Sequence, residues 1–272
     1  MCRVLGVSRS GFYKWLKWQL GKQAKDTMQL QKRIDSIYKD HKGRIGSPKM
    51  KKELDAQGVP AGKNRIASYM RKAGLRAITT KKFRGTTTDS KHSLPVAPNI
   101  LNREFTVSNC NNVWVTDITY VRTRKGWAYL VVFIDLYSRK VVGWAVGQSL
   151  ATEMVLKALY RAIRDRNPPA GLMIHSDRGC QYASMAFREV LNAYGFVQSM
   201  SRKGNCWDNA VAESFFKIYK TEFAYHNDFK DEQEVLHKTF EYVEIYYNRK
   251  RRHGSTNYLT PVAYENQFEK VA

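Results

Sequence analysis

Three strand-like stretches joined by short connections constrain the fold of this chain more than any other feature. They are Val113–Arg122, Trp127–Asp135 and Lys140–Val146. The first alternates apolar with polar residues and is rich in β-branched side chains, as is typical of strands, and Gly126 opens the second. Because the connections are short, we expect an antiparallel meander.

Helices and strands alternate after this meander. The expected elements are a helix over Thr152–Arg166, a strand over Leu172–Ser176, a helix over Ser184–Tyr194, a strand over Phe196–Met200 and a helix from Asn209 to about Phe223. The order β-β-β-α-β-α-β-α is that of a ribonuclease-H-like fold, in which helices cover a mixed sheet. We therefore predict an α/β core of this kind.

The first part of the chain has a helical pattern instead. Apolar spacing predicts three helices between residues 28 and 76, of which the second begins at Ser47-Pro48 and ends at Gly58. Residues 1–20 are compatible with the remnant of a helix-turn-helix with Ser8 as its N-cap, and equally with a plain amphipathic helix. We predict an all-α region of helix-turn-helix type.

Positive charge is concentrated in this helical part. Residues 1–110 hold 24 Lys and Arg against 7 Asp and Glu, whereas residues 111–272 hold 22 against 17. Such a surplus predicts a polyanionic partner, and we favour DNA phosphates over a merely solvated lysine face. An anionic membrane surface is the alternative, but no convincing amphipathic helix supports it. The candidate DNA contacts here are Lys49, Lys63, Arg65 and Arg71.

A stretch rich in Thr, Ser and Pro at residues 85–99 coincides with the shift in charge and predicts a linker. We expect a basic helical DNA-binding region at 1–84, a linker at 85–104 and the core at 105–272, the last with a basic C-terminal helix.

Cysteine and histidine usage excludes several classes of protein. The four cysteines form no CxxC pair and the six histidines no HxxxH spacing, which argues against a zinc finger and a disulfide framework. The longest apolar run, Trp127–Ile134, is too short to span a bilayer, and no signal peptide is evident. We expect a soluble cytoplasmic protein.

Three carboxylates are placed where such a core could use them. Asp117 lies within the first strand, Asp177 follows the fourth, and Glu213 lies in the first turn of the last helix. If the first and fourth strands are neighbours and that helix packs against them, the three converge. Three negative charges repel one another at one site unless cations bind between them, and carboxylate oxygens are ligands that suit Mg²⁺ or Mn²⁺. Two such ions would support attack on a phosphodiester.

Each carboxylate also has a structural explanation when it is taken singly. Asp117 could cap a strand end or pair with Arg139, Asp177 could be a turn residue, and Glu213 could complement the helix dipole. Taken jointly they favour catalysis, because all three fall where a metal site on this fold requires them.

Several motifs give the chain a resemblance to a known family. They are Trp114–Tyr120, Ile134–Arg139, His175–Gly179, Ser199–Asn205, Asp208–Ala210 and Tyr247–His253. Together with 35 residues between Asp177 and Glu213, and with Lys220 seven positions after Glu213, they resemble the OrfB-type transposases of bacterial insertion sequences. These are DDE enzymes related to retroviral integrases, and the resemblance covers nearly the whole chain.

The resemblance implies a Mg²⁺-dependent polynucleotidyl transferase with two ions in its active site. Asp117 would bridge both ions, with Asp177 on one and Glu213 on the other. Water would free a 3′-hydroxyl at the element end, and that hydroxyl would attack another DNA phosphate. The implied setting is bacterial nucleoid DNA, with a homo-oligomer on paired terminal repeats and fusion or cooperation with an upstream OrfA-type product.

Further residues are candidate DNA contacts. Lys217 and Lys220 share a helix face with Glu213, although either could be an ordinary surface lysine. The remaining candidates are Arg202, Lys203 and Trp207 in one loop and Arg249, Arg251 and Arg252 in a basic run. Trp207 could stack on a base or cover the core. His175 could orient Asp177 or be a packed strand residue.

Two other functions compete with transposition. A non-catalytic DNA-binding regulator would not need the three carboxylates or a metal. A ribonuclease-H-type nuclease would cleave without strand transfer, and the long basic N-terminal region argues against it. Joining of a 3′-hydroxyl end to a second duplex would separate the enzymatic alternatives.

Overall fold

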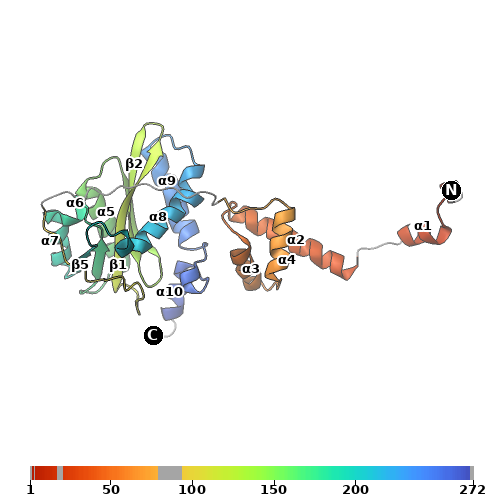
Figure 1. Ribbon diagram of the computed structural model, residues 1–272, viewed down its shortest axis with the longest axis horizontal. Helices are drawn as coiled ribbons and strands as arrows, with labels where there is room; N and C mark the ends of the chain where they lie inside the picture. The colour runs from red at the N-terminus through yellow and green to blue at the C-terminus, as the bar shows by residue number, and fades with distance from the viewer. Residues whose placement is uncertain (1, 3, 17–20, 79–93, 270–272) are drawn as a thin grey trace. The chain divides into compact units, whose positions relative to one another are not determined.

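The computed structural model describes residues 2, 4–16, 21–78 and 94–269, which form two compact units divided after Ile78 (Figure 1). The body of the first unit consists of α2 (Lys22–Asp40), α3 (Ser47–Ala56) and α4 (Lys63–Lys72), and these are the three helices expected from the sequence. Their shared core is Leu30, Ile34, Ile37, Ile45, Met50, Leu54, Ile66 and Met70. Gly46, rather than Ser47, occupies the cap position of α3.

A further helix, α1 (Arg9–Leu16), precedes these three in the chain. It begins after Ser8, whose hydroxyl accepts a hydrogen bond from the Gly11 backbone at 3.0 Å. None of the eight residues of α1 is buried, and Trp15 is 71% exposed. The apolar face of this helix is therefore open to solvent.

The second unit is built on a five-stranded sheet with the strand order β3-β2-β1-β4-β5. The strands are β1 (Val113–Thr123), β2 (Gly126–Asp135), β3 (Val141–Gly147), β4 (Met173–Ser176) and β5 (Val197–Met200). The first three form an antiparallel meander, and β4 and β5 add to β1 in parallel. The predicted mixed sheet is confirmed, with β1 at its centre.

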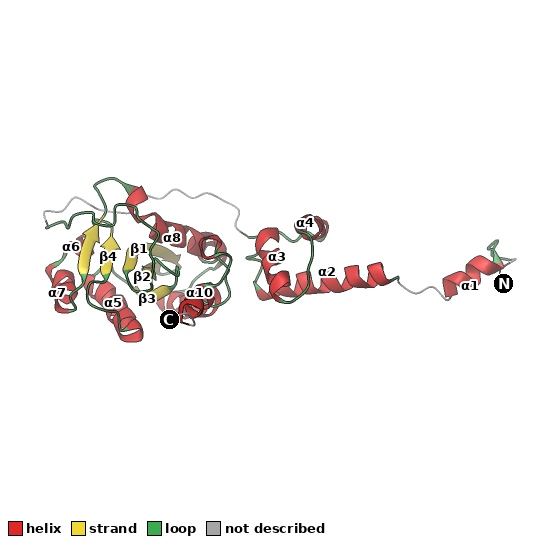
Figure 2. Ribbon diagram, turned by 90° about the horizontal axis from the view of Figure 1, so that it is seen from below, coloured by secondary structure: helices red, strands yellow, loops and turns green. Residues whose placement is uncertain are grey.

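Helices cover both faces of this sheet (Figure 2). One face packs against α5 (Thr152–Arg166), α6 (Cys180–Ala183) and α7 (Met185–Ala193). The other packs against α8 (Ala210–Glu222), α9 (Glu232–Phe240) and a π-helical segment, Glu241–Tyr247. Two short 3₁₀ turns, Cys206–Asn209 and Ala224–His226, flank α8.

Glycine allows α5 to approach the sheet at Gly143. A Cβ atom at this position would lie 2.4 Å from the Ala158 carbonyl oxygen and 2.6 Å from the Ala162 Cβ. The contact is possible only because Gly143 has no side chain.

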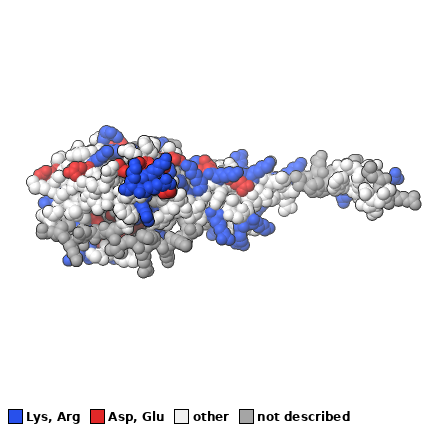
Figure 3. Space-filling view, turned by 90° about the horizontal axis from the view of Figure 1, so that it is seen from above, with Lys and Arg blue, Asp and Glu red and all other residues white. Residues whose placement is uncertain are grey.

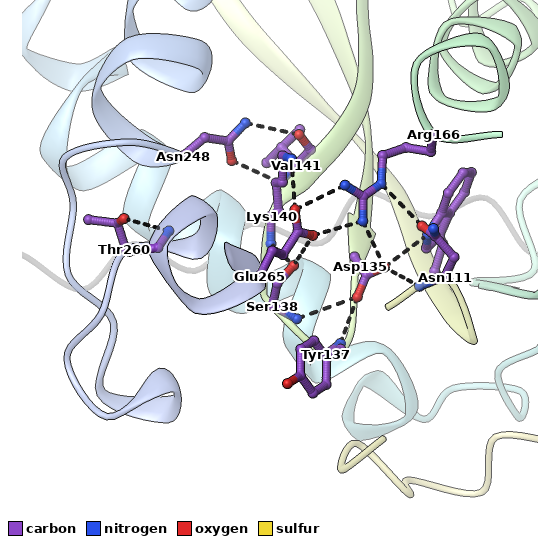
Figure 4. A network of polar contacts seen from close by, with 12 residues as sticks. Asn111, Asp135, Tyr137, Ser138, Lys140, Val141, Arg166, Asn248, Thr260 and Glu265 are labelled. Atoms are coloured by element: carbon purple, nitrogen blue, oxygen red, sulfur yellow. Dashed lines mark hydrogen bonds and ion pairs between the residues drawn. The ribbon is translucent and has the colours of Figure 1, made fainter. Parts of the chain in front are cut away.

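A buried polar network holds the C-terminal helix α10 (Pro261–Glu269) against the sheet (Figure 4). Glu265 accepts from the Ser138 hydroxyl and from the side chains of Lys140 and Arg166, each at 2.8 Å. Asn248 pairs with both backbone groups of Val141 at 3.0 Å, which closes part of the edge of β3. The C-terminal segment is therefore part of the core of the second unit.

Residues 79–93, which include much of the predicted linker, lie outside the described residues. The part that follows lies against the second unit, where Ile100 and Leu101 donate their backbone N–H groups to the Ser199 hydroxyl at 2.9 and 3.2 Å. In the part of the chain that the structure describes, no helix is long and apolar enough to cross a membrane.

Candidate active site

Asp117 lies on the central strand at a point where one side of that strand is open. The parallel pairing of β1 with β4 covers only Val113 to Val115. The two-residue period of a strand places Asp117 on the same face as Val115, which is the face that α8 covers. Its Oδ1 accepts a hydrogen bond from the Ile118 backbone at 2.8 Å.

Asp177 comes level with Asp117 through the register of the two strands. Val113 pairs with Met173 and Val115 with His175. Asp117 follows Val115 by two residues, and Asp177 follows His175 by two residues. The Gly179 backbone donates to Asp177 Oδ1 at 2.9 Å, which fixes one oxygen after the strand ends. Both carboxylates line one hollow at this end of the sheet.

Glu213 is brought to the same region by an anchored helix start. Asn209, directly before α8, donates its side-chain amide to the Thr116 carbonyl oxygen at 3.0 Å. This buried bond ties the beginning of the helix to the residue next to Asp117. Glu213 lies in the first turn of α8, and its side chain is exposed.

Mutual repulsion and burial perturb these groups. Burial raises the pKa of Asp117 well above its ordinary value, and the charges of Asp177 and Glu213 raise it further. The pKa of Glu213 is raised as well, because neighbouring protein atoms partly desolvate its exposed carboxylate, with a further contribution from Asp177. The pKa of Lys220 is lowered by burial, against the opposing effect of Asp117. The electrostatic coupling shows that the three carboxylates and Lys220 share one environment.

A buried hydroxyl pair lies beneath Asp117. Tyr182 and Thr116 share a hydrogen bond of 3.0 Å between their hydroxyl groups. Burial raises the pKa of Tyr182 well above its usual value, and the charges of Asp117 and Asp177 add to this effect. Tyr182 therefore stays protonated and supports the strand segment that carries Asp117.

The donor set suits a hard divalent cation. Carboxylate oxygens are the ligands that Mg²⁺ and Mn²⁺ prefer, and bound cations would relieve the repulsion that raises the pKa of Asp117. Among the described residues, however, no three His, Cys, Asp or Glu side chains already form a group able to hold a metal. The chemistry of the carboxylates fits the metal, but their present spacing does not form such a group.

Models of known families match most of the chain. An HTH-like domain matches residues 25–83, and two integrase core domain models match residues 108–206 and 213–268. The Escherichia coli (strain K12) transposase InsF for insertion sequence IS3A is 38% identical, over 98% of this chain and 93% of its own. The chain belongs to the IS3-family OrfB-type transposases.

Another relative of this transposase is the insertion element IS600 uncharacterized 31 kDa protein of Shigella sonnei, which is 40% identical over the full length of both chains. Among solved structures, the HTLV-2 integrase catalytic core domain in complex with magnesium is 19% identical. The structural match covers 57% of this chain and 96% of the integrase core domain, with a TM-score of 0.45. The family assignment therefore rests on the sequence relatives.

A fourth acidic residue, Asp208, organises the loop between β5 and α8. Asp208 is fully buried and accepts hydrogen bonds from the side chains of Arg202, Arg103 and Asn99, at 2.9, 2.7 and 2.9 Å. Hydrogen bonding from Arg202 holds the pKa of Asp208 well below its usual range. Arg202, predicted as a DNA contact, is thus also the clamp of this loop.

Two residues of this region had alternative explanations. Trp207 is 69% exposed, so it does not cover the core as one alternative proposed. His175 is buried, with its ring nitrogens 2.8 Å from the Ser199 hydroxyl and 3.2 Å from that of Ser201. Burial lowers the pKa of His175 to about 4. His175 is therefore a packed, neutral strand histidine.

Arg139, considered as an ion-pair partner of Asp117, lies elsewhere. It follows β2 and donates to the Phe105 carbonyl oxygen at 3.0 Å. This structural explanation for Asp117 is therefore wrong.

Most of the predicted DNA contacts carry accessible side chains. Lys63, Arg65, Arg71, Lys203, Lys217 and Arg249 are exposed, while Lys49 and Lys220 are partly buried. Figure 3 shows Lys and Arg side chains standing out on the helices of the first unit. Arg65 also donates to the Thr27 hydroxyl at 2.8 Å, and Lys220 Nζ lies 4.6 Å from the centre of the Tyr120 ring.

The basic run after the π-helical segment requires a correction. Arg251 is only 6% exposed and forms an ion pair with Glu222 at 2.8 Å, so its charge is neutralised inside the core. The predicted phosphate contact by Arg251 is wrong for this reason. Arg252 is half-buried and donates to the Tyr258 carbonyl oxygen at 3.0 Å.

Sequence reasoning missed the residues that support the carboxylates. Asp208 and Asn209 lie in one of the motifs that resemble the family. Nothing in their spacing indicated that Asp208 holds the loop or that Asn209 anchors α8. Tyr182 gave no signal, because it lies on α6 and its partner Thr116 lies on β1, 66 positions earlier in the chain.

Proposed function

We propose that this transposase cleaves and joins DNA strands at one active site made by Asp117, Asp177 and Glu213, with Mg²⁺ or Mn²⁺ as cofactor. One observation carries the proposal. The pairing of β1 with β4 and the bond from Asn209 to Thr116 bring the three acidic residues to one end of the sheet, where burial and the charges of Asp177 and Glu213 raise the pKa of Asp117. Such a repulsive arrangement is typical of a functional site.

The three carboxylates would hold two divalent ions, which supply a more acidic water and stabilise charge on a leaving oxygen. Hydrolysis breaks the bond between phosphorus and the 3′ oxygen, leaving a 3′-hydroxyl on the element end and a 5′-phosphate on the flank. In strand transfer that hydroxyl forms a new bond to phosphorus in a second strand and displaces its 3′ oxygen. Lys220, coupled to Asp117, would contact a neighbouring phosphate.

The HTH-like domain of a transposase implies DNA binding. We infer that the partners are the terminal repeats and the target duplex, in the bacterial nucleoid, with a homo-oligomer on paired ends and cooperation with an upstream OrfA-type product. The inferred phosphate and base contacts are Lys49, Lys63, Arg65, Arg71, Arg202, Lys203, Trp207, Lys217, Arg249 and Arg252.

A labelled duplex carrying the end of the parent element tests this function. The full chain is incubated with Mg²⁺ or with EDTA, and wild type is compared with Glu213→Gln, which keeps the shape and removes the charge. Glu189→Gln is the matched control, because Glu189 is an exposed glutamate on α7. We expect Mg²⁺-dependent nicking by wild type and control, and loss of nicking in Glu213→Gln.

Nicking by Glu213→Gln at the wild-type rate would remove Glu213 from the site. Tight binding without nicking, both by the chain alone and by its fusion to the upstream product, would favour a DNA-binding regulator. Nicking without joining to a second duplex would indicate a nuclease.

A further inference from the structure

A second hollow lies beyond Lys220, between the β1–β2 hairpin and the turn after α8. It measures about 820 Å³, within the range of roughly 300–1,000 Å³ typical of pockets for small ligands. Its lining includes Tyr120, Arg122, Trp127, Lys220, Tyr225 and His226. We call it the hairpin pocket.

The hairpin pocket presents aromatic rings to solvent. Trp127 and Tyr225 are each 52% exposed, although large aromatic side chains are normally buried. Tyr120 meets Trp127 edge to face, with ring centres 4.9 Å apart, which supports the indole in its exposed position. Exposed rings in a concave site suit stacking on a flat ligand such as a nucleobase.

Cations surround these rings. Lys220 and Arg122 line the hairpin pocket together with Arg124, which is paired with Asp228. Lys220 Nζ lies 4.6 Å from the centre of the Tyr120 ring. Only one of these three cations, Arg124, is paired with a carboxylate in the lining, so the lining keeps a net positive charge. Aromatic faces beside Lys and Arg match a nucleotide better than an apolar peptide.

The hairpin pocket adjoins the candidate active site. Tyr120 lines both this pocket and the hollow that contains Asp117 and Asp177. The Cα atoms of Asp117 and Tyr120 are about 10 Å apart along β1 at 3.3 Å per residue, and although their side chains leave the strand on opposite faces, both line the hollow of the candidate active site. Stacked nucleotides of one strand advance about 3.4 Å each, so about three of them span this distance.

We propose that the hairpin pocket binds an unpaired nucleotide of the DNA strand, about three nucleotides from the phosphate at the carboxylates. Its base stacks on the exposed ring of Trp127 or Tyr225, and Lys220 and Arg122 contact the adjoining phosphates. The proposal rests on the proposed function in taking DNA as the ligand and in placing the reacting phosphate at the carboxylates.

Binding of short DNA by the full chain tests this proposal without catalysis. Fluorescence anisotropy in EDTA compares a blunt duplex with the same duplex carrying three unpaired thymidines at its 5′ or its 3′ end. Because stacking on an aromatic ring contributes about 1–3 kcal/mol per base, we expect wild type to bind one extended duplex at least about fivefold more tightly than the blunt one.

At least one of Trp127→Ala and Tyr225→Ala is expected to lose this preference, and Trp127→Phe to keep it. Unchanged affinity of the variants for the blunt duplex shows that they are folded. Tyr160→Ala is the matched control, because Tyr160 is an exposed aromatic on α5 outside the pocket, and it should keep the preference.

Equal binding of all duplexes by wild type, or an intact preference in both Trp127→Ala and Tyr225→Ala, overturns the proposal. Either result would leave a protein segment as the occupant to consider. The binding assay omits the metal and is therefore independent of the nicking assay. Nicking of the element-end duplex without a binding preference here contradicts only the hairpin pocket. A binding preference without nicking contradicts only the catalytic proposal.

Discussion

The guanidinium of Arg251 meets the carboxylate of Glu222 inside the second unit, in two hydrogen bonds of 2.8 Å. Neither residue is more than 6% exposed. Burial alone lowers the pKa of Arg251, but hydrogen bonds and charge interactions, chiefly with Glu222, together outweigh this effect and the net pKa is raised. The pair joins the end of α8 to the segment that follows the π-helix, and therefore links the helix carrying Glu213 to the C-terminal part of the core.

Glu222→Gln should strongly destabilise the second unit. The substitution leaves the guanidinium of Arg251 buried without a counter-charge, and breaking one partner of a buried pair costs about 3–5 kcal/mol. Urea unfolding followed by tryptophan fluorescence measures this loss, since Trp114, Trp127, Trp144 and Trp207 lie in the second unit. Arg164→Ala, which removes an exposed pair with Asp165, should change stability little. Equal effects of the two substitutions would contradict this account.

Gly143→Ala should also destabilise the second unit, by about 1–3 kcal/mol. The added methyl group would lie 2.4 Å from the Ala158 backbone oxygen, so α5 must shift on the sheet. Gly147→Ala is the matched control on the same strand, because its nearest neighbour is the flexible Met154 sulfur at 3.0 Å. The same urea experiment compares them, and a Gly143→Ala protein as stable as the control would show that the close approach is not required.

The fold, and the position of Asp117 and Asp177 at one end of the sheet, were predictable from the pattern and order of the elements. The alternating pattern of β1 and the short connections of the meander are visible in the sequence. The position of Asp177 level with Asp117 follows from parallel pairing of the first and fourth strands, which the element order implies.

The roles of the buried charges were not predictable, because their partners are distant in sequence. Arg251 stands in a run of four basic residues that looks solvated or DNA-bound, yet Glu222, 29 positions earlier, holds it in the core. Glu265 binds Arg166, 99 positions away, and so draws in a helix that hydrophobic spacing did not indicate. The sequence shows the charge of such residues but not the tertiary contact that decides their burial.

Asp208→Asn should alter the dependence of stability on pH. The pKa of Asp208 is depressed by Arg202, so its contribution is complete above the unfolded pKa of about 3.9 and is lost as pH falls through the lower folded value. We expect the stability difference between wild type and Asp208→Asn to be constant above about pH 5 and to shrink below about pH 4. Urea midpoints between pH 7 and pH 2.5 give this difference. A difference that grows on acidification would have the wrong sign for this clamp.

Asn209→Ala should impair cleavage more than it impairs folding. The bond from Asn209 to the Thr116 carbonyl oxygen is the link between the start of α8 and the residue beside Asp117. Its loss frees Glu213 to shift, and a displacement of about 1 Å at a reacting centre costs up to roughly 100-fold in rate. Removal of one neutral hydrogen bond costs only about 1 kcal/mol in stability, or more if the Thr116 carbonyl stays unpaired.

Single-turnover cleavage of the element-end duplex at saturating Mg²⁺ measures the rate, and urea unfolding of the same preparation measures stability. Thr221→Ala is the matched control, because its hydroxyl also makes a 2.7 Å bond to a backbone carbonyl on α8 but at the far end of the helix. A rate loss of tenfold or more in Asn209→Ala alone would assign this residue to the positioning of Glu213. Equal rates in both variants would mean that the helix start keeps its place without the bond, and that Glu213 is positioned by the packing of α8 on the sheet.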